Sequence, residues 1–115
     1  MLKFSNKIIN GDCLKELKRI PDKTFDLVFA DPPYNMQIGD KLTRPDSSKV
    51  NGVNDKWDQF NNFKDYDNFC KAWLMECKRI LKDNGSIWVI GSYHNIFRLG
   101  YHLQNLDYWL LNDVI

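Results

Sequence analysis

The sequence predicts an α/β fold with a mostly parallel sheet. Two runs of residues, 25–30 and 86–91, are almost continuously apolar, and the first is typical of a strand covered on both faces. A strong helical pattern lies between the two runs. Because parallel strands need a crossover connection, this strand–helix–strand order favours parallel neighbours. At 115 residues, the chain has room for one domain at most.

The first predicted elements are a short strand and a helix. Residues 7–11 have the pattern of the strand, and residues 12–20 have that of a helix, which Pro21 ends. Leu14 and Leu17 recur at helical spacing and predict the buried side of this helix.

A long polar segment precedes the strongest helix. Residues 35–64 are rich in asparagine and lack periodicity, and a connection of 30 residues is usually functional or disordered. In the helix, Asp65 is expected to cap the start and the Asn-Gly pair at 84–85 to end it. Cys70 and Cys77 are predicted to be core residues, since they belong to one apolar stripe. The stripe contains Tyr66, Phe69, Cys70, Trp73, Leu74, Cys77, Ile80 and Leu81.

The last predicted elements are a helix over residues 95–106 and a third strand over residues 107–115. A buried strand left at a chain end would be an open edge that invites pairing. We therefore expect the chain to be the N-terminal piece of a longer protein.

Composition limits the possible functions. Apolar residues make up 43% of the chain, which argues against intrinsic disorder, and no apolar run approaches the roughly 18 residues of a membrane span. A net charge of +1 excludes nucleic-acid binding by bulk charge alone but leaves room for a local basic groove. The spacing of three cysteines and two histidines permits neither a disulfide framework nor a zinc cluster. A soluble protein of the reducing cytosol is expected.

The run Asp31-Pro32-Pro33-Tyr34 follows the strand at residues 25–30. Ligands of open α/β sheets bind at the carboxyl ends of the strands. The two prolines fix φ and lack N–H donors, so they leave stiff carbonyl acceptors. Asp31 adds a further acceptor, and Tyr34 adds a flat apolar face. Such a loop suits an exocyclic amino group on a planar ring.

Together with other segments, this run resembles the beta group of DNA adenine-N6 methyltransferases, and within it the bacterial cell-cycle-regulated enzymes that modify GANTC sites. The resemblance covers nearly the whole chain. The segments that carry it are Asn10-Gly11-Asp12-Cys13, residues 25–35, Asp55-Lys56-Trp57-Asp58-Gln59-Phe60 and residues 91–98.

The resemblance implies part of a class I, Rossmann-like fold that uses S-adenosylmethionine. Hydrogen bonds from the adenine amino group to the Asp31 carboxylate and the Pro32 carbonyl would localise the nitrogen lone pair. Those fixed acceptors would stabilise the charge that grows on the nitrogen during methyl transfer. Tyr34, next to Pro33 in the same catalytic loop, would stack on the base after it leaves the duplex. No covalent enzyme intermediate is needed.

The same resemblance gives Asp12, the Cys13 backbone and Asp31 contacts to the cofactor, although Asp12 could equally be the N-cap of the first helix. The family's glycine-rich cofactor turn is absent, because none of the six glycines forms a G-x-G. In the beta group this turn lies downstream of the catalytic loop, so its absence matches a chain cut at Ile115. We therefore expect the fragment to be inactive alone and to bind S-adenosylmethionine weakly or not at all.

Two segments are expected to contact double-stranded DNA. Within residues 35–64, Arg44, Lys49 and Lys56 would contact phosphates, or Arg44 would contact guanine; a solvated loop is the alternative. The second segment is Ser92-Tyr93-His94-Asn95, which follows the next strand and therefore lies on the same rim as Asp31. Helix capping by Ser92 or Asn95 is the alternative there. His102 is interpreted as structural.

Other functions remain open at this point. Cytosine-N4 methylation uses a similar loop, usually with serine in place of Asp31, and RNA or protein-glutamine methylation typically has asparagine there. A P-loop ATPase fragment would need a G-x-x-x-x-G-K-[ST] run, which the chain lacks. A non-catalytic DNA-binding remnant is the third alternative. We expect no membrane partner and no metal, and a homodimer is possible for the full-length enzyme.

Overall fold

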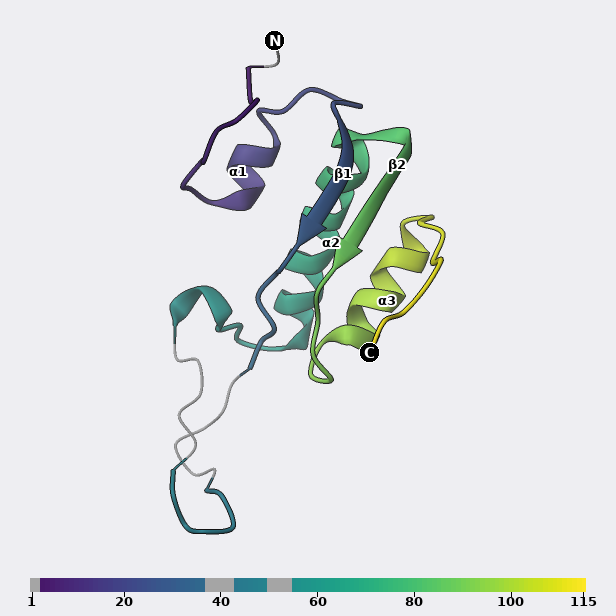
Figure 1. The fold of residues 1–115 in the computed structure, drawn as a ribbon. Helices are drawn as coiled ribbons and strands as arrows, with labels where there is room; N and C mark the ends of the chain where they lie inside the picture. Colours follow the sequence, from purple (N-terminus) through teal and green to yellow (C-terminus); the bar gives the residue numbers. More distant parts are fainter. Residues whose placement is uncertain (1–2, 37–42, 50–54) are drawn as a thin grey trace.

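The computed structural model describes residues 3–36, 43–49 and 55–115. The elements are α1 (Cys13–Leu17), β1 (Phe25–Ala30), the 3-10 turn η1 (Lys56–Asp58), α2 (Phe63–Ile80), β2 (Leu81–Val89) and α3 (Ile96–Asn105). Strands β1 and β2 lie side by side and point the same way (Figure 1). The predicted α/β fold with parallel neighbours is thus confirmed for this pair of strands.

The two strands pair in a parallel register that contains one irregularity. Leu27 pairs with Ser86 and Ala30 with Val89, but the register shifts between Phe25 and Leu27, where residues 82–85 form a bulge in β2. A Cβ added at Gly85 would lie 3.0 Å from the Lys82 carbonyl oxygen and 3.2 Å from that of Asp26. Because both neighbours are backbone atoms, a side chain at this position would require the backbone to shift by a few tenths of an ångström.

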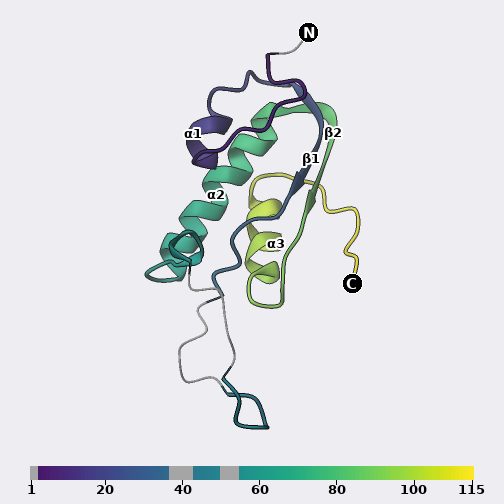
Figure 2. The ribbon, with the colours of Figure 1, turned by 60° about the vertical axis from the view of Figure 1, so that its left-hand side comes forward.

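The core lies on one face of the sheet only. Helices α2 and α3 pack on this face, and α1 packs on α2 (Figure 2). On the other face, Leu27 is 55% and Phe29 67% exposed. The prediction that the strand at 25–30 is covered on both faces is therefore wrong, because no helix of the described residues lies on that second face. The buried cluster consists of Tyr66, Cys70, Trp73, Leu74, Cys77, Leu99 and Leu103, with Val28, Ala30, Ile87 and Val89 packed against it.

Helix α2 buries most of the predicted stripe, but Phe69 is half-buried, Leu81 lies outside the helix, and both ends differ from the prediction. The Asn62 side chain accepts a hydrogen bond from the Asp65 N–H at 2.8 Å, so Asn62 is the cap and Asp65 lies inside the first turn. The helix ends at Ile80, because Leu81 is extended and begins β2. The Asn-Gly pair at 84–85 therefore belongs to the bulge and does not end the helix.

Both cysteines of α2 are core residues, as predicted. Burial raises the pKa of the Cys70 thiol to about 11 and that of Cys77 to about 12. Since the thiolate is the reactive form, neither cysteine is a ready nucleophile.

Two predicted strands do not form. Residues 7–11 and 107–115 have no ladder partner in the described parts of the chain, and Ile8 is fully exposed. A strand exists only through hydrogen bonds to a neighbour, and β1 and β2 pair with each other alone among the described residues. Tyr108 nevertheless ties the start of the last segment to α2, because its hydroxyl donates to the Leu74 carbonyl at 2.7 Å.

The first helix is shorter than the predicted 12–20, and Asp12 does cap it: its carboxylate accepts a hydrogen bond from the Lys15 N–H at 3.0 Å. Arg79 of α2 donates to the carbonyls of Leu17 and Ile20, which satisfies the end of this helical segment. The predicted last helix is confirmed as α3, with Asn95 at its N-cap position.

Of the long polar segment, the described parts hold η1 and a turn closed by an antiparallel bridge between Thr43 and Lys49. Residues 37–42 and 50–54 lie outside the described residues. Where the chain is described, no helix is both long enough and apolar enough to cross a bilayer.

Candidate active site

The two loops that carry the predicted site leave the sheet at the same edge. The Ile90 N–H donates to the Ala30 carbonyl at 2.8 Å, immediately beyond the last paired residues of the strands. The chain then continues from Ala30 into the Asp31–Tyr34 segment and from Ile90 into the segment around Ser92 (Figure 1). The predicted shared rim is thus confirmed.

Asp31 and Tyr34 contact each other across the tight loop between them. The Tyr34 hydroxyl donates to Asp31 Oδ1 at 2.6 Å, which holds the ring and the carboxylate together. This hydrogen bond, followed by burial and the nearby negative charge, raises the pKa of Tyr34 to about 12. The Asp31 side chain is exposed. The loop therefore presents a solvent-facing acceptor beside a neutral aromatic ring.

A buried hydrogen-bond chain lies beneath the loop. The Tyr66 hydroxyl donates to the Pro33 carbonyl at 2.9 Å and accepts a hydrogen bond from Asn95 Nδ2 at 3.0 Å. Asn95 Oδ1 in turn accepts from the Ser92 N–H at 2.8 Å. Tyr66 and Asn95 are each 1% exposed, and burial raises the pKa of Tyr66, so its hydroxyl stays protonated. The loops after β1 and β2 are joined through one tyrosine of α2.

Asp58 fixes the residues that follow the loop. Its side chain, 2% exposed, accepts hydrogen bonds from the N–H groups of Asn35 at 2.8 Å and Met36 at 2.9 Å. Asn35 has a φ of 56°, a left-handed conformation that asparagine tolerates better than most residues. The sequence predicted no role at the site for Asp58 or Tyr66. Tyr66 has the spacing of a core residue, so nothing in the sequence indicated a use for its hydroxyl. Asp58 is one of several acidic residues in a polar segment, and nothing local distinguishes it from the others.

The residues predicted to contact DNA fall into two groups. Arg44, Lys49 and Lys56 are exposed, the first two in the turn that Figure 1 shows beyond the carboxyl ends of the strands. In the other loop, Tyr93 and His94 are exposed, and their ring centroids lie 4.2 Å apart at a tilt of 33°.

Asn95, in the same loop, corrects the prediction. Its side chain is buried and engaged by Ser92 and Tyr66, so in this structure it is not available to DNA. Ser92 is half-buried, and its hydroxyl accepts a hydrogen bond from the His94 N–H at 3.3 Å. His102 is buried within 3.2 Å of Asp67, as its structural interpretation requires.

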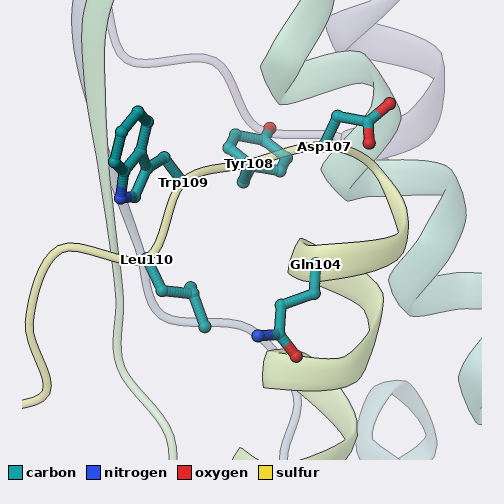
Figure 3. Close-up of a pocket in the computed structure, with 5 residues that line it drawn as sticks. All are labelled: Gln104, Asp107, Tyr108, Trp109 and Leu110. Carbon is teal, nitrogen blue, oxygen red and sulfur yellow. The ribbon is translucent and has the colours of Figure 1, made fainter.

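The residues predicted to contact the cofactor do not enclose a site. Asp12 and Cys13 are exposed at the start of α1. Partial desolvation of the thiol, followed by the Asp12 charge, raises the pKa of Cys13. A hollow of about 510 Å³ lies elsewhere, at the end of α3 (Figure 3). Figure 3 shows that it is lined by Gln104, Asp107, Tyr108, Trp109 and Leu110. A second hollow, beside α2, is lined by Met75, Lys78, Arg79, Asn105, Leu106 and Asp107. Neither hollow reaches Asp12, Cys13 or Asp31.

Comparison with known proteins identifies the class. Residues 25–115 match the family model described as DNA methylase (N6_N4_Mtase). The chain belongs to this DNA methylase family.

The chain is similar in sequence to two curated methyltransferases. It is 60% identical over 112 residues to the Type II methyltransferase M.HinfI of Haemophilus influenzae, covering 97% of this chain and 31% of that protein. It is 35% identical over 107 residues to the Type II methyltransferase M2.MboI of Moraxella bovis, covering 93% of this chain and 39% of that protein. The chain thus spans between three and four tenths of the length of the two relatives.

Proposed function

We propose that this chain is the N-terminal part of the catalytic domain of a site-specific DNA adenine-N6 methyltransferase with a class I, Rossmann-like fold. Residues 1–115 form one part of that domain, and residues 35–64 form its DNA-contacting loop. The observation that carries this proposal is the pairing of Asp31 with Tyr34 in a proline-stiffened loop at the carboxyl end of β1. Membership of the DNA methylase family supports DNA as the substrate.

The loop offers what an aromatic amino group needs to become nucleophilic. The amino nitrogen of adenine shares its lone pair with the ring, so it reacts poorly without help. Asp31 Oδ2 and the Pro32 carbonyl would each accept a hydrogen bond from one N–H of the amino group. These acceptors would stabilise the positive charge that develops on the nitrogen. Asp31 Oδ1 is already occupied by Tyr34, which keeps the ring beside the carboxylate for stacking on the flipped base.

S-adenosylmethionine would supply the methyl group. Asp12, the Cys13 backbone and Asp31 are the residues of this chain that would contact it. Neither of the two hollows is lined by these residues, and the remaining contacts would come from elsewhere in the full-length protein.

Double-stranded DNA is the proposed partner. Tyr93, His94 and Ser92 lie on the rim of Asp31 and would contact the bases or backbone near the target, while Arg44, Lys49 and Lys56 would contact phosphates. A GANTC recognition site and a homodimer of the full-length enzyme are parts of the same proposal. The enzyme would act in the bacterial cytoplasm, where its DNA is.

The test uses the full-length protein with S-adenosylmethionine and a duplex that contains one GANTC site. After digestion to nucleosides, mass spectrometry should find N6-methyladenine, and a duplex with the site scrambled should stay unmodified. N4-methylcytosine as the product would replace the adenine assignment. Specific binding to the duplex without any methylated nucleoside would instead support a DNA-binding remnant.

A further inference from the structure

Each proline of the acceptor loop fixes only one of its two backbone dihedral angles. Proline sets φ near −65°, but ψ, which decides where each carbonyl points, is left to the surroundings. At Pro33 the surroundings are specific, because its carbonyl accepts a hydrogen bond from the Tyr66 hydroxyl at 2.9 Å. Tyr66 is 1% exposed, and the ring of Phe60 packs edge-on against it at 4.9 Å. The direction of this carbonyl is thus set by the rigid helix α2.

The same hydroxyl is shared with the neighbouring loop. Tyr66 accepts a hydrogen bond from Asn95 Nδ2, and Asn95 Oδ1 accepts one from the Ser92 N–H. One phenolic oxygen therefore holds the loop after β1 as a donor and the loop after β2 as an acceptor. Since the oxygen is buried, loss of either bond would leave a polar group without a partner.

The far end of the acceptor loop is held by a buried carboxylate. Asp58 accepts two backbone hydrogen bonds, from Asn35 and Met36, which fixes the left-handed turn immediately after Tyr34. Each of the two side-chain oxygens of Asp58 accepts one of these bonds, so two successive N–H groups are held at once. The loop is thus fixed at Pro33 by one side chain and just beyond Tyr34 by another.

We propose that Tyr66 and Asp58 are positioning residues for methyl transfer. They touch neither the base nor the cofactor; they fix the peptide planes on either side of Tyr34 and so aim the Asp31 and Pro32 acceptors at the target amino group. This inference rests on the proposed function. Misplacing acceptors by about 1 Å is enough to cost about 100-fold in rate, so these buried contacts control turnover.

The structure supplies a matched pair of variants. Tyr66→Phe removes the hydroxyl from Pro33 and Asn95 but keeps the ring in the core. Tyr108→Phe removes a comparable hydroxyl, which donates to the Leu74 carbonyl at 2.7 Å, away from both loops. Each variant loses a phenol-to-carbonyl hydrogen bond next to α2, so both substitutions should lower the melting temperature for the same physical reason.

In the full-length enzyme, Tyr66→Phe should lower kcat by about 10- to 100-fold with KM for the duplex changed by less than about twofold. Tyr108→Phe should leave kcat within about twofold of the wild type. Equal kcat values for the two variants would overturn the proposal. If Tyr66→Phe does not fold, Asp58→Asn takes its place. This substitution keeps the volume of a side chain that lies outside the core cluster, and it should likewise lower kcat while leaving KM for the duplex nearly unchanged. A wild-type kcat in Asp58→Asn would then overturn the proposal.

A second measurement does not depend on which base is methylated. In NMR spectra of the labelled full-length protein, Tyr66→Phe should move the amide signals of both Tyr34 and Ser92, whereas Tyr108→Phe should leave both in place. Unmoved signals would refute the positioning role even if the wild type proves active. A wild type that methylates cytosine would refute the adenine assignment alone, because the kcat ratio of the two variants could still be measured on that product.

Discussion

At the scale of single residues, Asp31 is the group on which the proposed chemistry depends most. It is exposed at the carboxyl end of β1, and one of its oxygens already holds Tyr34. In the full-length enzyme, Asp31→Ala should lower kcat at least about 1,000-fold, because it removes a charged acceptor from the developing ammonium. DNA affinity should stay within about threefold, since phosphate contacts dominate binding.

The measurement combines single-turnover methylation with a gel-shift titration. Asp83→Ala is a suitable control, because the side-chain contact of Asp83 within the described residues is an exposed ion pair with Lys23, a type of pair that contributes little. Substantial turnover by Asp31→Ala would remove this carboxylate from the mechanism.

At the scale of elements, two glycines predict opposite effects of the same substitution. Gly85→Ala should destabilise the protein by about 1–3 kcal/mol, because the new Cβ would lie 3.0 and 3.2 Å from two carbonyl oxygens in the β2 bulge. Gly100→Ala should stabilise it by about 0.5–1 kcal/mol, because Gly100 lies inside α3 and nothing is within 4 Å of the added carbon.

Denaturant unfolding of the two variants, measured beside the wild type, tests this pair. A neutral Gly85→Ala would show that the bulge can widen without loss.

Helix α2 also predicts how stability depends on pH. Burial raises the pKa of Cys70 to about 11 and that of Cys77 to about 12, and it raises the pKa of Tyr66 as well. These groups hold their protons in the folded state at pH values where they ionise in the unfolded chain, from about 9 for thiols and 10 for phenols. Their contribution is therefore complete below pH 9 and is lost as the pH rises through the folded values.

Thermal melts between pH 7 and 11 should show a melting temperature that falls steeply above pH 9. In a Cys77→Ala variant the fall should be shallower, because one of the titrating groups is missing. A melting temperature that stays level up to pH 11 would contradict the burial of these groups.

At the scale of the whole molecule, the residues proposed to bind the methyl donor do not make a complete site. Asp12 and Cys13 are exposed, and neither hollow in the described parts of the chain includes them. Residues 1–115 alone should therefore show no methyltransferase activity. Their Kd for S-adenosylmethionine should be higher than about 100 µM. Isothermal titration calorimetry checks this, with the full-length enzyme as the positive control. Micromolar affinity of the short chain would mean that the site is complete without a glycine-rich turn.

The bare face of the sheet belongs to this scale as well. Leu27, Phe29 and Trp88 are at least half exposed on the side away from the helices. Their composition is that of a covered strand, which is why the sequence predicted burial on both faces. The amino-acid composition of a strand indicates which of its faces can be buried. The exposure of its side chains depends on which other elements pack against those faces.

Local patterns in the sequence were enough to predict several of the helices and strands. The apolar stripe from Tyr66 to Ile80 lies in a helix and residues 25–30 form a strand, as predicted, although the helix ends and the burial of the strand differ. Chain order alone indicated that Asp31 and Ser92 share an edge. Helical periodicity and the crossover rule act within short stretches of chain, so no distant contact was needed to recognise them.

The contacts that support the candidate site could be found only from the folded chain. Tyr66 had the spacing of a core residue, and the fold alone brought its hydroxyl to Pro33 and Asn95, which lie 33 and 29 positions away in the chain. The same applies to Asp58, whose carboxylate serves amides more than 20 positions away. Such hydrogen bonds join groups that no local pattern relates, because their partners are chosen by packing between elements. For the same reason residues 7–11, although strand-like in sequence, form no strand without a neighbour to pair with.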